Sequence, residues 1–383
     1  MANKYPVILV HGVFGYGPNE ALGFSYWRIA MKAEHPPGVA VSEATVGPLS
    51  SNHDRACELF AQIKGDKYSQ VDYGEPHAKE AGHERKGKAF AAGLYPAWSE
   101  KKPIHLVGHS QGGPTIRMLQ YLLSIDFWGA GTNENWIKSI TGISAAFNGS
   151  TLPYKICCHE DSGLVDTVRG GFLGIVLKAM AGLIGSKFVS VYDFDLGHWH
   201  LTPRAPGEPW PDYVKRIESA KLFEGKDNAA YSLTIQGLLE ENRQNPTFTN
   251  TYYFSHVTEQ TFKVPLLGRY APQPGMNPFL FGGSAWMGFH KFTTPFYPGF
   301  ENEDWWENDG AVSTYSQMYP RTAGHHPVAG EFDDTTSGFE PGKWYWQYLH
   351  GYDHLDVAMM AEPGQVARLR DFYAKLFRRL SAL

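Results

Sequence analysis

The 383-residue chain has few cysteines, no large excess of charge of one sign and no internal repeat. Its cysteines are Cys57, Cys157 and Cys158, and the adjacent pair could bridge only through a strained ring, so a disulfide framework is excluded. The formal net charge is -5 with acidic and basic residues interspersed, which disfavours nucleic acid and an anionic-membrane anchor as partners. The length predicts one domain, residues 1–383, carrying large insertions.

Long apolar runs are also missing. Met1 to Lys4, which precede the first apolar run, lack the apolar stretch of a secretory signal, so we expect either an intracellular protein or a processed form. The most apolar insertion, Leu164 to Lys187, has an uninterrupted part shorter than the roughly 20 residues that span a bilayer, and its glycines weaken a membrane helix further. The sequence therefore predicts no transmembrane segment.

One serine lies in a Gly-x-Ser-x-Gly frame, within His-Leu-Val-Gly-His-Ser-Gln-Gly-Gly at residues 105–113. The apolar residues 104–107 before it predict a buried strand, and the helical spacing of apolar residues over 115–124 predicts a helix. In such a strand–turn–helix, Gly108 and Gly112 avoid collisions with the neighbouring elements and the serine hydroxyl is held toward substrate. Ser110 is therefore the candidate nucleophile.

A second apolar run, residues 6–10, leads into the glycine-rich turn His-Gly-Val-Phe-Gly at 11–15. Turns of this kind supply an oxyanion-hole amide in serine hydrolases, and the residue after the nucleophile supplies another. The sequence predicts that the backbone N–H groups of Val13 and Gln111 play these parts. Two unrelated strand-to-loop transitions in an ordinary parallel sheet are the alternative.

A serine hydroxyl is a weak nucleophile until a base takes its proton and a carboxylate orients that base. Downstream of Ser110, Asp309 lies in a polar Asn-Asp-Gly turn and His354 lies in a loop before a predicted C-terminal helix over 364–383. A tight turn without chemistry and a surface histidine are the plain interpretations of these two residues. The rival acids are Asp304, Asp353 and Asp356, the rival base is His350, and His109 is too close to the nucleophile to serve easily.

The chain order Ser110, Asp309, His354 is that of the α/β-hydrolase fold, so we predict an α/β protein with a mostly parallel central sheet and a Ser-His-Asp triad. The predicted chemistry is ester cleavage through an acyl-enzyme. A carboxylesterase or polyester hydrolase with the same triad is an alternative to a lipase. A non-catalytic binding protein of the same fold is the alternative from another functional class.

Seven motifs in one order make the chain from about Tyr5 to Leu383 resemble the thermoalkalophilic bacillary lipases, bacterial lipase family I.5. These motifs are His11-Gly12, residues 23–27 (Gly-Phe-Ser-Tyr-Trp), 46–52 (Val-Gly-Pro-Leu-Ser-Ser-Asn), 71–74 (Val-Asp-Tyr-Gly), 109–113 (His-Ser-Gln-Gly-Gly), 307–310 (Glu-Asn-Asp-Gly) and 353–355 (Asp-His-Leu). The resemblance implies a secreted triacylglycerol lipase that acts on ester or lipid substrates at a lipid–water interface, as a monomer or weak dimer. Gly108 departs from the alanine that the family usually has in its elbow.

The resemblance also implies two structural metals. Zinc would be held by Asp54, His77, His83 and Asp227. Two imidazoles and two carboxylates can close a tetrahedral site, although histidines six apart in a polar loop are by themselves a weak signal. His53 stands where the family usually has a tryptophan, so it could weaken aromatic shielding or compete as a ligand.

Calcium would be held by the backbone oxygens of Gly275 and Pro363 and by the carboxylates of Asp356 and Glu362, with an apparent one-residue insertion before Glu362. The resemblance further implies an inserted zinc-binding subdomain formed by about 50–95 with 200–235. It also implies a helical lid at about 160–190, for which a buried core helix is the alternative. The expected location is extracellular, with a cytoplasmic one as the alternative.

Overall fold

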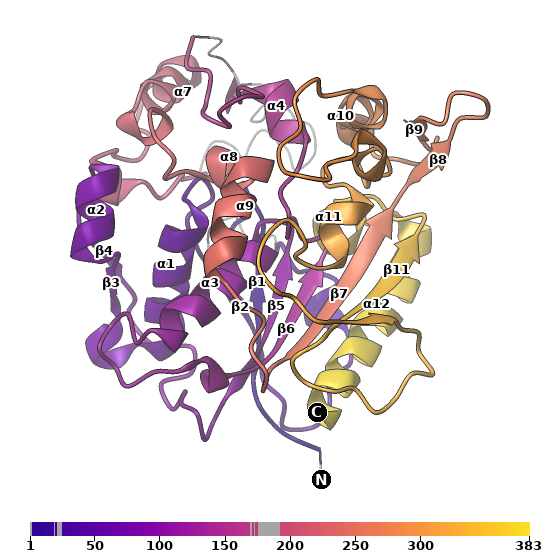
Figure 1. Ribbon diagram of the computed structural model, residues 1–383. Helices are drawn as coiled ribbons and strands as arrows, with labels where there is room; N and C mark the ends of the chain where they lie inside the picture. Colours follow the sequence, from indigo (N-terminus) through magenta and orange to yellow (C-terminus); the bar gives the residue numbers. More distant parts are fainter. Residues whose placement is uncertain (1, 19, 21–24, 169–170, 172, 175–191) are drawn as a thin grey trace.

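The computed structural model describes residues 2–383 except 19, 21–24, 169–170, 172 and 175–191. A seven-stranded sheet in the order β10-β11-β7-β6-β5-β1-β2 forms the centre of the molecule (Figure 1). Its strands are β1 (Val7–Val10), β2 (Val41–Ala44), β5 (Ile104–His109), β6 (Ile137–Ile143), β7 (Tyr252–Glu259), β10 (Val328–Glu331) and β11 (Trp344–His350). Within the described residues every pairing in this sheet is parallel, which confirms the predicted kind of sheet.

The central strands are apolar on both faces because the sheet is covered on both sides. β1 reads Val-Ile-Leu-Val and is buried at every position, as expected for a strand between two layers of helix. Successive side chains of a strand point to opposite faces. Ile8 and Val10 accordingly enter one hydrophobic core, whereas Val7 and Leu9 enter the other.

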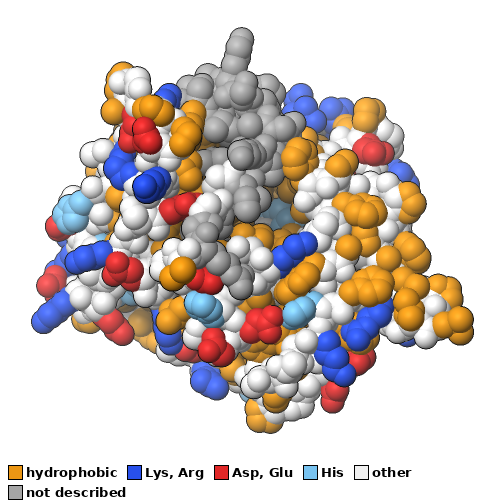
Figure 2. Space-filling view, turned by 90° about the horizontal axis from the view of Figure 1, so that it is seen from above, with side chains coloured by type: hydrophobic (Ala, Val, Ile, Leu, Met, Phe, Trp, Pro, Cys, Tyr) orange, Lys and Arg blue, Asp and Glu red, His pale blue; other side chains and the backbone are white. Residues whose placement is uncertain are grey.

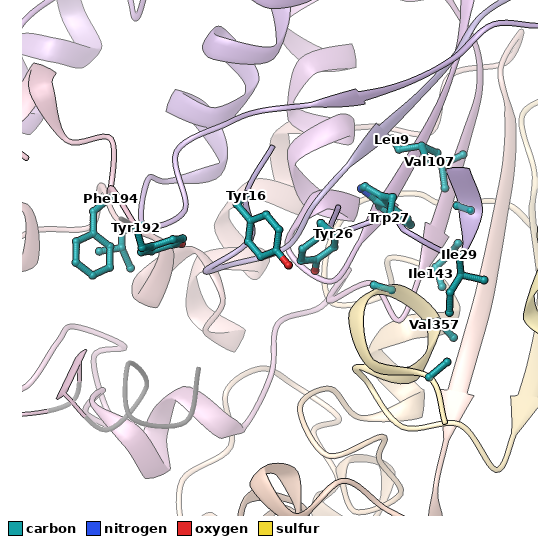
Figure 3. Close-up of a cluster of buried hydrophobic side chains, with 14 of the residues drawn as sticks. Leu9, Tyr16, Tyr26, Trp27, Ile29, Val107, Ile143, Tyr192, Phe194 and Val357 are labelled. Atoms are coloured by element: carbon teal, nitrogen blue, oxygen red, sulfur yellow. The ribbon is translucent and has the colours of Figure 1, made fainter. Parts of the chain in front are cut away.

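Two helices that follow strands of this sheet cover the first face. These are α1 (Asn52–Lys64), which begins after β2, and α3 (Gly112–Ser124), which begins after β5. The second face is covered by the C-terminal helix α12 (Pro363–Ala382), whose apolar residues pack in the other core. Figure 3 shows part of that core, where the rings of Tyr192, Tyr16, Tyr26 and Trp27 lie in a row that leads toward Leu9 of the sheet. The strand predicted before Ser110 and the helices predicted over 115–124 and 364–383 are therefore present, with boundaries that differ by a few residues.

Shorter elements surround the sheet. The helices are α2 (Glu75–Ala81), α4 (Leu152–Ile156), α7 (Trp210–Glu218), α8 (Ala229–Ser232), α9 (Ile235–Gln244), α10 (Pro278–Phe289) and α11 (Thr314–Met318). The single-turn helices are η1 (Ala30–Lys32), η2 (Asp66–Tyr68), η3 (Glu134–Trp136), η4 (Gly197–Trp199), η5 (Lys221–Phe223), η6 (Asn302–Trp305) and the π-helical η7 (Asp356–Met360). Two antiparallel hairpins complete the fold, β3 (Gln70–Asp72) with β4 (Lys86–Ala89), and β8 (Thr261–Lys263) with β9 (Tyr270–Pro272).

The loops at the carboxyl ends of the parallel strands meet at one edge of the sheet, at the top of Figure 1, where α4, α10 and α11 also lie. This is the edge at which open α/β sheets bind their ligands. Among the described residues, no helix combines the length and the apolarity needed to cross a bilayer. Most of the lid predicted at about 160–190 lies outside the described residues.

Candidate active site and metal site

Ser110 occupies a strained turn between β5 and α3. Its backbone φ is +54°, a left-handed conformation that residues with a side chain rarely adopt. The turn is tight because a Cβ atom at Gly112 would lie 2.2 Å from the Val10 carbonyl oxygen, and one at Gly108 would lie 2.3 Å from the Gly112 backbone. Glycine at both positions thus lets α3 start close against the sheet, as predicted. The contact at Gly108 explains why this chain does not carry the alanine of the resembling family there.

Asp309 and His354 form a buried acid–base pair. His354 Nδ1 lies 2.8 Å from Asp309 Oδ2, and the His354 backbone N–H donates to the Asp309 carbonyl oxygen at 2.9 Å. The Asp309 side chain is fully buried, and four further donors hold its two oxygens: the backbone N–H groups of Ala311 and Val312, the Thr258 hydroxyl and the Gln317 amide. With so many donors, the carboxylate is fixed in the orientation in which it accepts from the imidazole.

The rival residues have other partners. The Asp353 carboxylate accepts backbone N–H groups from Asn277, Leu355 and Asp356, so it organises the loop that carries His354. Asp304 is exposed. The His350 side chain is 71% exposed and pairs with Glu259 at 3.2 Å. Of the candidate acids and bases, Asp309 and His354 are thus the two that are buried together.

The predicted oxyanion turn lies directly against the nucleophile. A Cβ atom at Gly12 would lie 2.7 Å from Ser110 Cβ and 3.1 Å from Ser110 Oγ. Among the described residues, no protein oxygen accepts a hydrogen bond from the backbone N–H of Val13 or Gln111. Gln111 is also the N-cap of α3, where the helix dipole favours negative charge. The turn can therefore supply free donors to an oxyanion beside Ser110.

A buried arginine that sequence reasoning missed supports this turn. Arg55 on α1 is fully buried and donates to the carbonyl oxygens of His11 and Gly47 and to the Thr115 hydroxyl. Burial lowers the pKa of Arg55 to about 10, which leaves the guanidinium charged at neutral pH. Because these contacts join residues far apart in the chain, no local pattern in the sequence could have indicated them.

A hydrogen-bonded chain joins the turn to the base. The Gly12 N–H donates to the Tyr26 hydroxyl at 3.1 Å, and this hydroxyl lies 2.6 Å from His109 Nδ1. His109 Nε2 lies 2.9 Å from the His354 carbonyl oxygen. Burial lowers the pKa of His109 well below its ordinary value, so the ring is neutral and its single N–H donates to His354. His109 therefore acts as a structural link, in line with its exclusion as the base.

The four residues predicted to hold zinc come together in the structure. The ligand atoms of Asp54, His77, His83 and Asp227 all lie within 4.8 Å of one another. The His77 Nε2 atom is 3.0 Å from Asp54 and 3.3 Å from Asp227, and His83 Nε2 is 3.6 Å and 3.1 Å from the same carboxylates. Bonds of about 2.0 Å to a tetrahedral metal place ligand atoms about 3.3 Å apart, so these separations suit such an ion.

Two further features of the group fit a metal ion. His83 Nε2 and both carboxylate oxygens of Asp227 are buried without a hydrogen-bond partner among the described residues, which is costly unless an ion satisfies them. His83 Nδ1 lies 2.8 Å from the Glu84 carbonyl oxygen and donates to it, which leaves the Nε2 lone pair directed at the group. The group can therefore bind a metal ion.

Two more histidines flank this group. The ring of His53 stacks on His77 with centroids 3.6 Å apart, so it covers the group as an aromatic residue would. His198, from η4, lies with its Nε2 atom 3.2 Å from Asp54 Oδ2. Sequence reasoning missed His198 because it lies more than one hundred residues from Asp54 and belongs to no motif.

Two of the residues predicted to hold calcium, Asp356 and Glu362, accept hydrogen bonds from the protein itself. The Gln365 amide donates to Asp356 Oδ2 at 3.1 Å, and the Asp353 N–H donates to the same oxygen at 3.0 Å. The Glu362 side chain caps α12. The Gln365 amide and the Asp353 N–H thus share one oxygen of the Asp356 carboxylate, and calcium binding at these residues stays a prediction.

A parallel sheet covered on both faces, with a serine on the elbow after a central strand and an acid and a histidine on later loops, defines an α/β-hydrolase. Residues 3–382 match the family described as lipase-like, C-terminal domain. The chain belongs to this family, which confirms the resemblance to the family I.5 lipases.

Individual relatives agree over the full chain. EstA from Clostridium botulinum is 30% identical with a TM-score of 0.83, covering 100% of this chain and 88% of that one. Lipase 1 from Pelosinus fermentans is 31% identical with a TM-score of 0.79, covering 100% and 99% of the two chains. Lipase 2 of Staphylococcus aureus is 31% identical over 99% of this chain and 54% of its own length. The chain thus spans about half the length of the curated relatives that it matches.

Proposed function

We propose that this protein is a carboxylic ester hydrolase with Ser110 as nucleophile, and that its substrates are triacylglycerols. The observation that carries the proposal is the buried pair of His354 and Asp309, whose atoms lie 2.8 Å apart, with the His354 ring 4.7 Å from the ring of His109 on the elbow of Ser110. Relatives named lipases share about 31% of their residues with nearly the whole chain and support the substrate class.

In the proposed mechanism, His354 Nε2 takes the hydroxyl proton of Ser110 while the alkoxide adds to the ester carbonyl carbon. The oxyanion accepts the N–H groups of Val13 and Gln111, and the Asp309 carboxylate stabilises the imidazolium. The intermediate collapses, the alcohol leaves with the proton from His354, and Ser110 remains acylated. Water then repeats the two steps with the same base, which releases the acid and restores the serine.

A series of p-nitrophenyl esters from acetate to palmitate, measured with and without emulsified triacylglycerol, tests this function. Long-chain hydrolysis that increases with the emulsion supports a triacylglycerol lipase. Activity on short chains alone would make the protein a carboxylesterase, the second candidate. A wild-type protein that neither hydrolyses any ester nor reacts with a fluorophosphonate at Ser110 would instead be a binding protein of this fold.

The Asp309→Asn variant is expected to lose about 10⁴-fold in kcat. An amide at this position can donate toward Nδ1 of His354, which favours the tautomer that cannot take the serine proton. The measurement is kcat on p-nitrophenyl butyrate, with circular dichroism to verify the fold. The matched control is Asp304→Asn, an exposed acid nearby, which should keep wild-type turnover. Full activity in Asp309→Asn together with an inactive Asp353→Asn would move the acid to Asp353.

We also propose that the metal at Asp54, His77, His83 and Asp227 is zinc. Two imidazole nitrogens and two carboxylate oxygens suit its tetrahedral geometry. With four protein ligands there is no open position for a reacting water, so zinc would stabilise the fold and take no part in ester cleavage. The surrounding insertion, about 50–95 with 200–235, would be the zinc subdomain of a single domain. Calcium is not part of this proposal.

The proposed location, extracellular, rests on the family resemblance.

A further inference from the structure

Exposed apolar side chains concentrate on one side of the top face. Of the eleven large apolar side chains that are exposed in the described part of the chain, six lie between residues 262 and 289. They are Phe262, Leu266, Leu267, Phe279, Phe281 and Phe289. We call them, with the exposed Lys263 and Lys291, the hairpin–α10 surface, because they lie on the β8–β9 hairpin, on α10 and next to these elements. Figure 2 shows hydrophobic side chains gathered on that side of the top face, with basic side chains among them.

The tip of the hairpin extends away from the body of the protein. Leu266 is as exposed as in a free peptide, at 106%, and Leu267 is 62% exposed. Leu266 has a φ of +65°, so the turn holds a leucine in a left-handed conformation that it rarely adopts. Exposing leucine side chains to water at such a tip is unfavourable, whereas contact with an apolar medium would bury them.

Helix α10 has no polar face. Its sequence is Pro-Phe-Leu-Phe-Gly-Gly-Ser-Ala-Trp-Met-Gly-Phe, without a single charge. A helix that is apolar on all sides normally lies in a protein core or in lipid. One side of the helix is packed on the protein, through the buried Ser284, Met287 and Gly288 and the half-buried Trp286, whereas Phe279, Phe281 and Phe289 are exposed. Within the described part of the chain, the exposed phenylalanines of α10 are thus left for an apolar partner.

The same helix is fastened to the catalytic loops. The N–H of Asn277, its N-cap, donates to Asp353 Oδ2 at 2.7 Å, and Asp353 directly precedes His354. A Cβ atom at Gly310, the residue after Asp309, would lie 2.7 Å from Leu280 Cβ. An apolar surface that contacts α10 would consequently be placed beside the loops that carry the acid and the base.

The charge of this part of the chain differs from that of the whole. From Gln260 to Phe300 there is no aspartate or glutamate, and the charged residues are Lys263, Arg269 and Lys291, although the full chain has a net charge of -5. Lys263 and Lys291 are exposed beside the apolar side chains. A positive apolar surface fits the surface of a lipid aggregate that carries negative charge, which ester hydrolysis itself would generate as fatty acid carboxylates. Two copies of the chain meeting through this face would bring like charges together.

We propose that the hairpin–α10 surface is a docking surface for anionic lipid, with Leu266 and Leu267 inserting among the acyl chains and the lysines contacting the headgroups. The proposal rests on the proposed hydrolysis of lipid esters, since it places the lipid beside Ser110, His354 and Asp309.

Vesicle binding tests the proposal without requiring catalysis. The protein is the full chain carrying Ser110→Ala, which cannot consume the lipid, and the vesicles are phosphatidylcholine with and without one third phosphatidylglycerol. Adding Leu266→Asp and Leu267→Asp should weaken partitioning onto both vesicles by at least about tenfold, since each leucine would lose its burial in the apolar layer. Adding Lys263→Gln and Lys291→Gln should weaken binding by at least about fivefold, only on the anionic vesicles.

The matched control is Ile125→Asp, which changes a 52% exposed apolar residue at the far end of α3 and should leave partitioning unchanged. With Ser110 intact, the Leu266→Asp, Leu267→Asp variant should hydrolyse soluble p-nitrophenyl butyrate at the wild-type rate, which verifies its fold. If Leu266→Asp and Leu267→Asp, added to Ser110→Ala, left partitioning onto the vesicles unchanged, the proposal would be overturned. It would also be overturned if sedimentation showed that the face forms a dimer and that the dimer does not bind vesicles. Loss of ester hydrolysis in the wild type would instead contradict the proposed function, and the two failures are thus distinct.

Discussion

The Ser110→Ala variant is expected to lose about 10⁶-fold in kcat on every ester that the wild type cleaves, because no other group near the elbow can form the acyl-enzyme. Its melting temperature should stay at the wild-type value, since the hydroxyl holds no structural position in the hydrogen-bond network of the described residues. Purified wild type and variant are compared on p-nitrophenyl esters and in thermal unfolding. Ordinary turnover by the variant would contradict the assignment of the nucleophile.

A second substitution at the same position separates chemistry from strain. Because Ser110 has a φ of +54°, Ser110→Gly should be as inactive as Ser110→Ala but more stable than the wild type by about 1 kcal/mol. The free energy of unfolding of the three proteins in denaturant gives this difference. If Ser110→Gly were less stable than Ser110→Ala, the turn would not be strained at this residue.

Removal of the metal is expected to lower the melting temperature by about 10 °C, because a buried group of two carboxylates and two imidazoles would lose the ion that satisfies it. Elemental analysis of the purified protein should find one zinc ion per chain, and prolonged chelation should remove it. Calorimetry before chelation, after chelation and after zinc is restored gives the size of the effect.

Asp227→Asn tests whether the metal lies at the predicted ligands. This variant should bind zinc poorly and unfold at a temperature close to that of the chelated wild type. Asp212→Asn, which changes an exposed acid on α7, is the matched control and should retain both zinc and stability. A metal-free preparation of undiminished stability, or full zinc content in Asp227→Asn, would remove the zinc proposal.

The elements around Ser110 could be predicted from the sequence because their signals are local. Glycines two residues either side of Ser110, an apolar run before it and helical spacing after it fall within one short segment. The reason for glycine at position 112 is nevertheless tertiary, because a Cβ atom there would lie 2.2 Å from the Val10 carbonyl oxygen on β1. The order of serine, acid and histidine then indicated the fold.

Other features could not be predicted because they depend on the tertiary structure. The sequence favoured Asp309 as the acid but kept Asp304 and Asp353 as rivals; exposure separates Asp304 from it, and hydrogen bonding separates the equally buried Asp353. Arg55 and His198 lie in no motif, and their roles come from contacts with residues far along the chain, His11 and Thr115 for Arg55 and Asp54 for His198. The calcium ligands were inferred from the resemblance, which gave no indication that the Gln365 amide donates to Asp356.

Asp54 and Arg55 are neighbours on α1, and this limits the insertions and deletions that the protein can tolerate. One residue faces the metal-binding group and the next holds the turn beside Ser110, so both depend on the rotational register of the same helix. Deleting one residue upstream in α1 would turn both side chains by about 100° and remove both contacts at once. Insertions and deletions should therefore be tolerated in the loops after α1 but not at its start. An engineer who transplants the metal-binding insertion must accordingly move the helix start together with the turn that it supports.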